Sequence, residues 1–313
     1  MKWWNNYWFR QAPLLDLALI RLVAVGVQLV IVQTGWLKLD NMAYLSGLPA
    51  DMFSPLPIVK MYLLPFGSEY VPTLQMLTLV WWVTFVAGIM SFVGFRTNSS
   101  LVVFTLGSVF MCAYYYSFGE MHHPDAVVVI ALSVLALSPS GKALSVDSII
   151  KGRLARPQER LVDRTSAYAG WPILVIQWFF VLMYLSAGSH KMLVSGMDWM
   201  NGYTLQYYLI QEGLQHGSRI GLWLSQHHLF LVMAQWLVIF FQFTFSLAVI
   251  FPRLRWIYIP LGLTFHLAIL LTLKAGFLTW IWLYAVFFPW SRVFRLLSDY
   301  PGLGTDKSAG EAA

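Results

Sequence analysis

The sequence predicts an all-α integral membrane protein, a polytopic helical bundle of about eight transmembrane helices. Of its 313 residues, 58% are hydrophobic and only 11% are charged. Soluble domains carry about 25% charged residues, so this composition excludes an ordinary soluble protein. Long apolar stretches recur through the whole chain, and the connections between them alternate between rich and poor in Lys and Arg. Together these features predict repeated membrane crossings.

Each expected span is an apolar stretch that approaches the length of about 20 residues needed to cross a bilayer as a helix. The stretches 124–137 and 277–290 are the shortest and resemble buried or re-entrant helices, so the count could change by about one or two. The expected spans cover residues 14–35, 71–95, 101–116, 124–137, 171–191, 229–251, 256–273 and 277–290.

The distribution of basic residues predicts the orientation. The N-terminus, the turn at Arg96, the connection 138–166, the turn at Arg253 and the C-terminal tail are rich in Lys and Arg. Cytoplasmic connections carry this excess, so both termini are expected in the cytoplasm. This topology also accounts for the net charge of +6, which therefore does not indicate nucleic acid as a partner.

The ends of the chain are expected to differ from the bundle. The first 13 residues are aromatic and amphipathic and predict a segment on the membrane surface with no cleavable signal peptide. Residues 1–295 are expected to form one transmembrane domain and residues 296–313 a disordered cytoplasmic tail. The single cysteine, Cys112, excludes a disulfide framework and a cysteine-based metal site.

Two outward connections, 36–70 and 192–228, are long enough to predict caps or a lid over a site. The second begins within YLSAGSHKMLVSGMDWMNGYTL, in which an apolar helix ends at His190 and Lys191. A lysine at such a place is costly and indicates function. It can act as a base only when neutral, and removal from water favours the neutral form.

Gln177, Tyr184 and Lys191 are spaced seven residues apart, which predicts one polar face on the fifth span. This face could line a site. Alternatively, Gln177 and Tyr184 could join helices by hydrogen bonds while Lys191 extends to the interface.

Histidines give a second set of candidates. His266 lies in the middle of the seventh span, where it must find a partner on another helix, as a structural residue or as a substrate contact. His122 and His123 open the fourth span. A metal site composed from these and the group His216, His227 and His228 is an alternative, although the spacing matches no metal signature and no metal is expected.

Aromatic residues lie within the spans and not only at their ends. They suit a pocket for a flat hydrophobic ring such as a quinone, and packing alone is the competing interpretation. The interior aromatic residues are Trp178, Phe179, Phe180, Trp236, Phe240, Phe241, Phe243, Phe245, Trp280, Trp282, Tyr284, Phe287 and Phe288.

The lysine stretch resembles that of vitamin K-dependent gamma-glutamyl carboxylase. The resemblance rests on Ala187-Gly188, His190-Lys191, Asp198-Trp199 and Gly202-Tyr203, in that order. It extends to the histidine-bearing helix at residues 121–150, with its Ser-Val-Asp turn at 145–147, and to the Phe-His pair at 265–266. The chain is therefore identified as similar to the HTTM superfamily, the bacterial relatives of the carboxylase membrane domain.

The resemblance implies an enzyme of the bacterial inner membrane with its cavity facing outside. Lys191 would deprotonate a reduced vitamin K or menaquinol-type hydroquinone, and one of His122 and His123, with His123 favoured, would handle a second proton. Oxygen and carbon dioxide would be co-substrates, and the acceptor would be a glutamate of a small secreted peptide or protein. The remaining residues implied to bind the quinol are His266, His190, Tyr184, Gln177, Trp199, Gly202 and Tyr203.

Two departures from the family limit these implications. The first residue of the family's basic pair is His190 here, so its charge depends on pH. The family's large extracytoplasmic domain is not expected after the last span, which leaves propeptide-guided protein substrates without support.

Three functions follow from these residues. The first is a carboxylase-like, quinol-dependent enzyme, which requires Lys191. The second is a non-carboxylating membrane factor for the maturation or export of a secreted peptide, which would survive loss of that lysine. The third is a binding or transport protein for a hydrophobic ring compound, which would bind a quinone without consuming oxygen.

Overall fold

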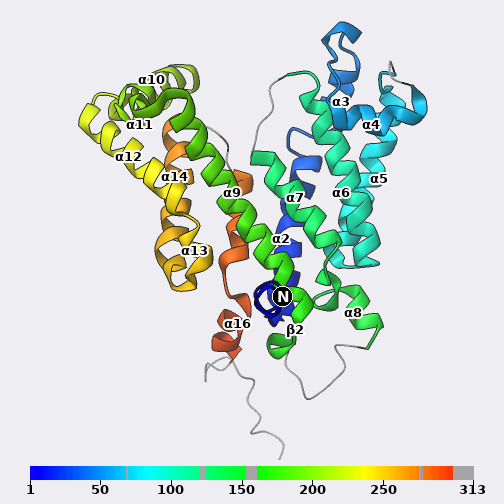
Figure 1. Cartoon of the computed structure of the whole chain (residues 1–313). Helices are drawn as coiled ribbons and strands as arrows, with labels where there is room; N and C mark the ends of the chain where they lie inside the picture. The colour runs from blue at the N-terminus through cyan, green and yellow to red at the C-terminus, as the bar shows by residue number, and fades with distance from the viewer. Residues whose placement is uncertain (68–69, 120–123, 153–160, 275, 277, 299–313) are drawn as a thin grey trace, which may run out of the picture. The chain divides into compact units, whose positions relative to one another are not determined.

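The computed structural model describes the chain except residues 68–69, 120–123, 153–160, 275, 277 and 299–313. Helices form most of the described part, and the one described sheet is a pair of two-residue strands (Figure 1). The all-α prediction is confirmed. The elements are α1 (Lys2–Trp8), β1 (Ala12–Pro13), α2 (Leu14–Gln33), α3 (Leu39–Ser46), η1 (Ala50–Met52), α4 (Pro57–Leu63), η2 (Leu64–Phe66), α5 (Leu74–Val93), α6 (Thr97–Tyr116), α7 (Pro124–Ala136), η3 (Ser140–Lys142), α8 (Val146–Ile150), η4 (Leu161–Asp163), β2 (Thr165–Ser166), η5 (Ala167–Ala169), α9 (Gly170–Ser195), η6 (Gly196–Met200), α10 (Tyr203–His216), α11 (Arg219–Leu224), α12 (His228–Thr244), α13 (Leu247–Ile250), η7 (Pro252–Leu254), α14 (Arg255–Leu273), α15 (Leu278–Leu283), η8 (Tyr284–Phe287) and α16 (Trp290–Ser298).

Among the described residues, five helical stretches are long and apolar enough to cross a membrane: Leu14–Gln33, Leu74–Val93, Thr97–Tyr116, Ala167–Met200 and Pro252–Leu273. They correspond to five of the expected spans.

The other three expected spans are shorter or interrupted helices. The stretch 124–137 forms the 13-residue helix α7, and 229–251 is divided between α12 and α13. The described residues of the stretch 277–290 are divided among α15, η8 and the start of α16. Pro289 lies just before α16. Proline disfavours the α conformation of the residue that precedes it, which accounts for the break between η8 and α16.

The chain folds as two compact units. Unit 1 consists of Met1–Met121, Leu132–Ile173 and Phe288–Ala313, and unit 2 consists of His122–Ala131 and Leu174–Phe287. Helices α7 and α9 each contribute residues to both units.

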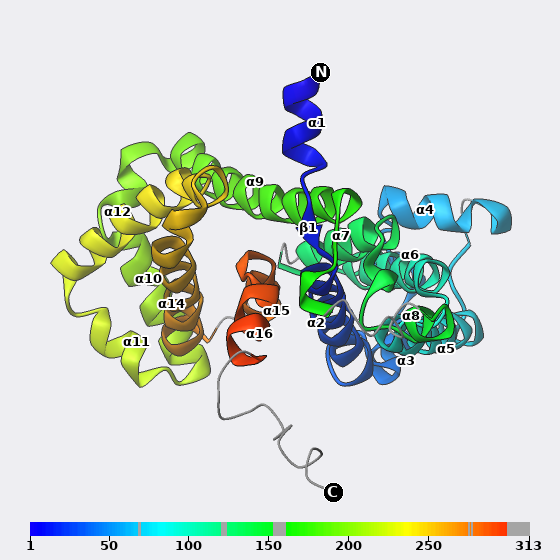
Figure 2. The same cartoon turned by 90° about the horizontal axis from the view of Figure 1, so that it is seen from below.

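Helices α5 and α6 form an antiparallel hairpin in unit 1 and lie side by side in Figures 1 and 2. Gly94 ends α5 in the left-handed conformation, with φ of 75°. A β-carbon at Gly107 of α6 would collide with Thr84 of α5, so this glycine permits the close approach of the two helices.

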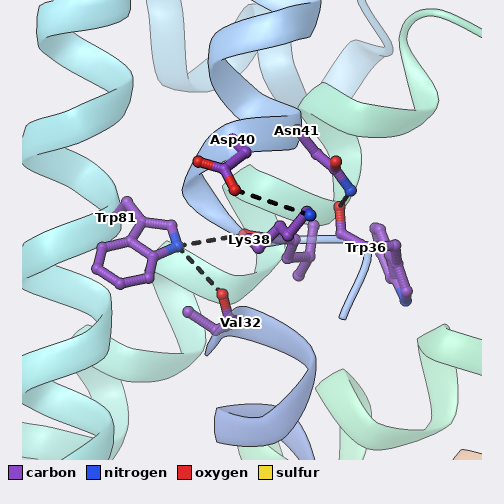
Figure 3. A network of polar contacts seen from close by, with 7 residues as sticks. Val32, Trp36, Lys38, Asp40, Asn41 and Trp81 are labelled. Carbon is purple, nitrogen blue, oxygen red and sulfur yellow. Dashed lines mark hydrogen bonds and ion pairs between the residues drawn. The ribbon is translucent and has the colours of Figure 1, made fainter. Parts of the chain in front are cut away.

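The polar contacts in Figure 3 fix the chain where α2 ends. The indole nitrogen of Trp81 on α5 donates hydrogen bonds of 3.2 Å to the carbonyl oxygens of Val32 and Leu37. Val32 belongs to the last turn of α2, where carbonyl groups have no partner in the helix itself, and Leu37 follows the helix. Lys38 forms an ion pair of 3.7 Å with Asp40 in the same turn. The connection 36–70 therefore begins as an ordered turn.

The segment that follows α7 is attached to α2 and to the α5–α6 turn within unit 1. Arg21 of α2 is fully buried and donates hydrogen bonds to the carbonyl oxygens of Ser140 and Leu144 at 3.2 and 2.5 Å. The carboxylate of Asp147 accepts hydrogen bonds from the backbone N–H groups of Arg96 and Thr97 at 2.8 and 2.7 Å. Asp147 therefore caps the start of α6 from a distant part of the chain.

Unit 2 contains α10, α11, α12 and α14. Helix α10 packs on α11, α12 and α14, and Figure 2 shows α10, α12 and α14 next to one another. The long connection 192–228 is thus folded into η6, α10 and α11 and is anchored on the two following long helices.

Candidate functional site

Helix α9 presents Gln177, Tyr184 and Lys191 to three different sets of partners, all within unit 2. At about 1.5 Å per residue, each is about 10 Å along the helix from the next. The predicted polar face therefore exists, and the contacts of its three members distinguish their roles.

Lys191 is half-buried near the C-terminal end of α9. Its Nζ atom donates hydrogen bonds to the carbonyl oxygen of Ala187 at 3.1 Å and to Oε1 of Gln242 on α12 at 3.4 Å. The amine also lies 5.4 Å from the centre of the Trp199 ring, a cation–π distance. In the described part of the chain no carboxylate forms an ion pair with it, so a proton can leave or join this amine without breaking such a pair.

The rest of the lysine stretch is held by α12. Gly202 has φ of 92°, and its N–H donates a 2.6 Å hydrogen bond to Oε1 of Gln235. A β-carbon at Gly202 would lie 2.7 Å from the His228 ring, so only glycine fits this backbone. The Tyr203 ring contacts the His228 ring in a tilted arrangement, with centroids 4.5 Å apart, while most of the Tyr203 residue is exposed.

The sequence analysis did not identify Gln235 and Gln242 as candidate site residues, although their spacing could have indicated them. With His228 they are seven residues apart on α12, the same spacing as the polar residues of α9. Gln235 is 1% exposed and its Nε2 has no hydrogen-bond partner in the described part of the chain; the same holds for Nδ1 of His228. This end of unit 2 therefore has hydrogen-bonding capacity that the described residues leave unused.

Tyr184 forms a buried hydrogen-bonded cluster in the middle of unit 2. Its hydroxyl lies 2.7 Å from Nε2 of His266 on α14 and is hydrogen-bonded to the hydroxyl of Tyr284 in η8. All three side chains are less than 5% exposed. His266 thus has the partner on another helix that its position required. Tyr284 was singled out in the sequence only as one of many interior aromatics.

Aromatic rings enclose this cluster. The Trp280 ring lies 5.5 Å from Tyr184 and 5.7 Å from His266, and its Nε1 is buried with no hydrogen-bond partner in the described part of the chain. The buried members of the predicted aromatic set are Phe180, Phe241, Phe245, Trp280, Tyr284 and Phe287. Several others face outward, namely Trp236, Phe240, Phe243, Trp282 and Phe288. The aromatic set therefore divides into an inner cage and an outer surface.

Gln177 joins elements by hydrogen bonds. Its Nε2 donates to the carbonyl oxygen of Val286 at 2.9 Å, and its Oε1 accepts from Nη2 of Arg255 at 3.1 Å. Both ends of the amide are used, as the helix-joining interpretation of Gln177 expects.

The remaining histidines have varied surroundings. His190 is exposed, and His122 and His123 lie outside the described residues. His216 lies 2.8 Å from the Glu212 carboxylate, and Nδ1 of His227 lies 3.0 Å from the Trp223 carbonyl oxygen. Among the residues that the structure describes, no group of three or more His, Cys, Asp or Glu side chains could hold a metal ion.

A family model described as the HTTM domain matches residues 16–291 of the chain. The match includes every candidate residue named above. No curated protein and no solved structure matches the chain.

Proposed function

This chain belongs to the HTTM domain family, and from that premise we propose that it is a membrane-embedded, quinol-dependent enzyme of the carboxylase-like type. HTTM domains occur in vitamin K-dependent carboxylase-like proteins. In this proposal Lys191 is the base, a hydroquinone is the first proton donor, and a glutamate of a small peptide or protein is the acceptor of carbon dioxide.

The environment of Lys191 is the observation that carries the proposal. An amine in an apolar helix is costly to keep, and this one has no ion-pair partner among the described residues. Two oxygen atoms and one indole ring hold it in place. A structural lysine at a membrane boundary would extend into water instead.

Two features of the described residues support a flat hydroxylated ring as the ligand. Trp280 Nε1 and Gln235 Nε2 are buried donors without a partner in the described part of the chain, and the buried ring cage gives Trp280 an apolar surrounding. Bound hydroquinone would supply the reducing power and the acidic hydroxyl. Lys191 would take the proton from that hydroxyl, and Gln242 and Trp199 would orient the amine.

The cluster of Tyr184, His266 and Tyr284 would serve as a positioning group for the base. Tyr184 lies two helical turns before Lys191 on the same face of α9, so its fixed hydroxyl determines the rotation of that face. His123 remains the proposed second proton-handling residue on the basis of the family resemblance.

The site is further proposed to face the outer side of a bacterial inner membrane, with both termini in the cytoplasm. The distribution of Lys and Arg supports this orientation. A small secreted peptide would then meet the site after export, and no nucleic acid is involved.

The test uses the full-length protein in lipid nanodiscs with menaquinol or reduced vitamin K. Quinone epoxide formation, oxygen uptake and incorporation of labelled carbon dioxide into a glutamate-containing peptide are measured for the parent, Lys191→Ala, Lys191→Arg and the control Lys60→Ala. Both Lys191 variants are expected to lose epoxidation by about 10²–10⁴-fold, the usual contribution of a general base. Arginine fails because it cannot be deprotonated, and Lys60→Ala is expected to retain activity.

Different outcomes separate the alternatives. Epoxidation that persists in Lys191→Ala overturns the proposal. Quinone binding without oxygen uptake in the parent indicates a ring-binding or transport protein. Export or maturation of a peptide that is insensitive to Lys191→Ala indicates the non-carboxylating membrane factor.

A further inference from the structure

We propose that a groove on the α5–α6 hairpin of unit 1 binds an anionic phospholipid, with one acyl chain along the groove and the phosphate at Arg96. Two adjoining cavities form this groove, which we call the hairpin groove. They have volumes of about 500 and 340 Å³ and share Val83 of α5 and Val103 of α6. Because Val83 and Val103 line both cavities, the two cavities lie next to each other along the hairpin.

Small side chains create the depression. Thr84 and Gly107 are in close contact across the hairpin, and both line the second cavity. Ala87 and Ser100 line the first cavity. Large apolar residues on either side, such as Trp82 at 51% and Leu106 at 51% exposure, rise above this floor. A flexible hydrocarbon chain can fill such a space, whereas the rigid side chains of the hairpin leave it open.

The length of the groove suits an acyl chain. Its lining on α5 runs from Met76 to Met90, which at about 1.5 Å per residue is about 21 Å. One leaflet of the hydrocarbon core is about 15 Å thick, half of the whole core. An acyl chain that starts at the hairpin turn can therefore stay in contact with the groove through its own leaflet.

Arg96 provides the charge complementarity. It lines the end of the groove at the turn between α5 and α6, and its side chain is exposed. Each helix has 20 residues, so the turn lies at headgroup level when the hairpin crosses a bilayer. In the described part of the chain no carboxylate forms an ion pair with the guanidinium group. Guanidinium groups bind phosphate oxygens in a bidentate manner.

The backbone at Arg96 is held in place for this role. Arg96 has φ of 45°, an unusual conformation for a residue with a side chain. Its N–H donates a 2.8 Å hydrogen bond to the Asp147 carboxylate, which fixes that conformation. The backbone that carries the Arg96 side chain is therefore fixed next to the hairpin groove, and a phospholipid likewise carries its phosphate beside its chains.

The experiment places the full-length protein in nanodiscs that contain a phospholipid with a photoreactive group on one acyl chain. Phosphatidylglycerol and phosphatidylcholine probes are compared, and crosslinked residues are identified by mass spectrometry. Val83→Trp fills the groove where the two cavities meet, and Val102→Trp adds the same bulk to an exposed position of α6 that is not part of the lining. Arg96→Gln removes the charge, with Arg253→Gln as the matched control at another basic turn.

The expected result is crosslinking concentrated at lining residues of α5 and α6 and stronger for phosphatidylglycerol. Val83→Trp removes it, and Val102→Trp does not. Arg96→Gln lowers the preference for phosphatidylglycerol by about fivefold, the effect of about 1 kcal/mol for one basic residue at a membrane surface, and Arg253→Gln leaves it unchanged. Crosslinks spread evenly over all exposed helices, or equal labelling by both lipids, would each overturn the proposal.

Discussion

Asp147 is expected to stabilise the α5–α6 hairpin more than any surface ion pair of unit 1 does. Its carboxylate accepts three hydrogen bonds, two from backbone N–H groups at the start of α6 and one from the Thr97 hydroxyl at 2.8 Å. Asp147→Ala removes all three. Arg96 is exposed and water can replace its lost partner, but Thr97 is 1% exposed, so its two donors stay unpaired.

The magnitude follows from these contacts. Loss of a helix N-cap costs about 0.5–2 kcal/mol, and each buried donor left unpaired costs about 1–3 kcal/mol. These contributions overlap, so we expect Asp147→Ala to lower the free energy of unfolding by about 3 kcal/mol. Asp147→Asn keeps one acceptor oxygen and should lose roughly half as much.

The effect of Asp147 should depend on pH in a defined direction. Partial burial raises the pKa of its carboxyl group, but the hydrogen bonds from Thr97 and Arg96 outweigh burial and hold the pKa below its ordinary value. A lowered pKa in the folded state means that the stabilisation is present above the unfolded value, about 3.9, and is lost as pH falls through the folded value. The difference between parent and Asp147→Asn should therefore be constant from pH 7 to about pH 5 and shrink below about pH 4.

The assay is thermal unfolding of the purified full-length protein in detergent, followed at one scan rate because membrane proteins often unfold irreversibly. The control is Asp163→Ala, which breaks an exposed ion pair with Arg295 at 2.6 Å and should cost about 0–1 kcal/mol. If Asp147→Ala and Asp163→Ala unfold at the same temperature, the capping argument is wrong.

Two further substitutions test the buried cluster of unit 2. Tyr184→Phe removes the hydroxyl that is hydrogen-bonded to His266 and Tyr284 and should lower the free energy of unfolding by about 2–3 kcal/mol. Its control is Tyr203→Phe, at an exposed ring, which should leave stability unchanged. Equal effects of the two substitutions would contradict a stabilising role for the buried cluster. Gly262→Ala places a methyl group against the Tyr284 hydroxyl and should cost about 1–3 kcal/mol. Its control is Gly119→Ala, where a β-carbon meets nothing within 4 Å, and no loss of stability in Gly262→Ala would show that the cluster can move aside.

The sequence was sufficient for the helical class and for five of the eight expected spans, because the length of an apolar stretch reports directly on the thickness of the bilayer. It was not sufficient for the broken spans. The stretch 277–290 is mostly apolar in composition, yet its described residues form α15, a 3₁₀ turn and the start of α16. Hydropathy measures the free energy of transferring side chains from water to an apolar phase and carries no information about whether a helix is continuous. Pro289 was the local signal for this interruption.

The long connections show the opposite limit. Residues 203–216 form α10, although their amphipathic sequence is too polar for a span. Its stability comes from packing on α11, α12 and α14, and such tertiary support cannot be read from a local pattern. The length of the connection 192–228 predicted a cap but not the regular helices α10 and α11 that it contains.

The site residues differ in how far sequence could predict them. Gln177, Tyr184 and Lys191 were found by spacing because α9 is continuous. Tyr284 and Trp280 were not separated from other aromatics because α15 and η8 are too short to have a periodic face. Gln235 and Gln242 are on a continuous helix and could have been found by the same rule as the α9 residues.

The two polar faces of α9 and α12 explain why the lysine stretch has its particular residues. Gln242 Oε1 binds the Lys191 amine, and Gln235 Oε1 binds the Gly202 amide, so the oxygen atoms of both glutamines are used on residues 191–202. Seven residues separate the two glutamines, about 10 Å along α12, so the stretch must run along that helix at a fixed register. Gly202 is required because its positive φ and the His228 ring leave no room for a side chain. The glycine and the glutamines thus set the position of the amine, and the chemical role that we propose falls on Lys191 itself.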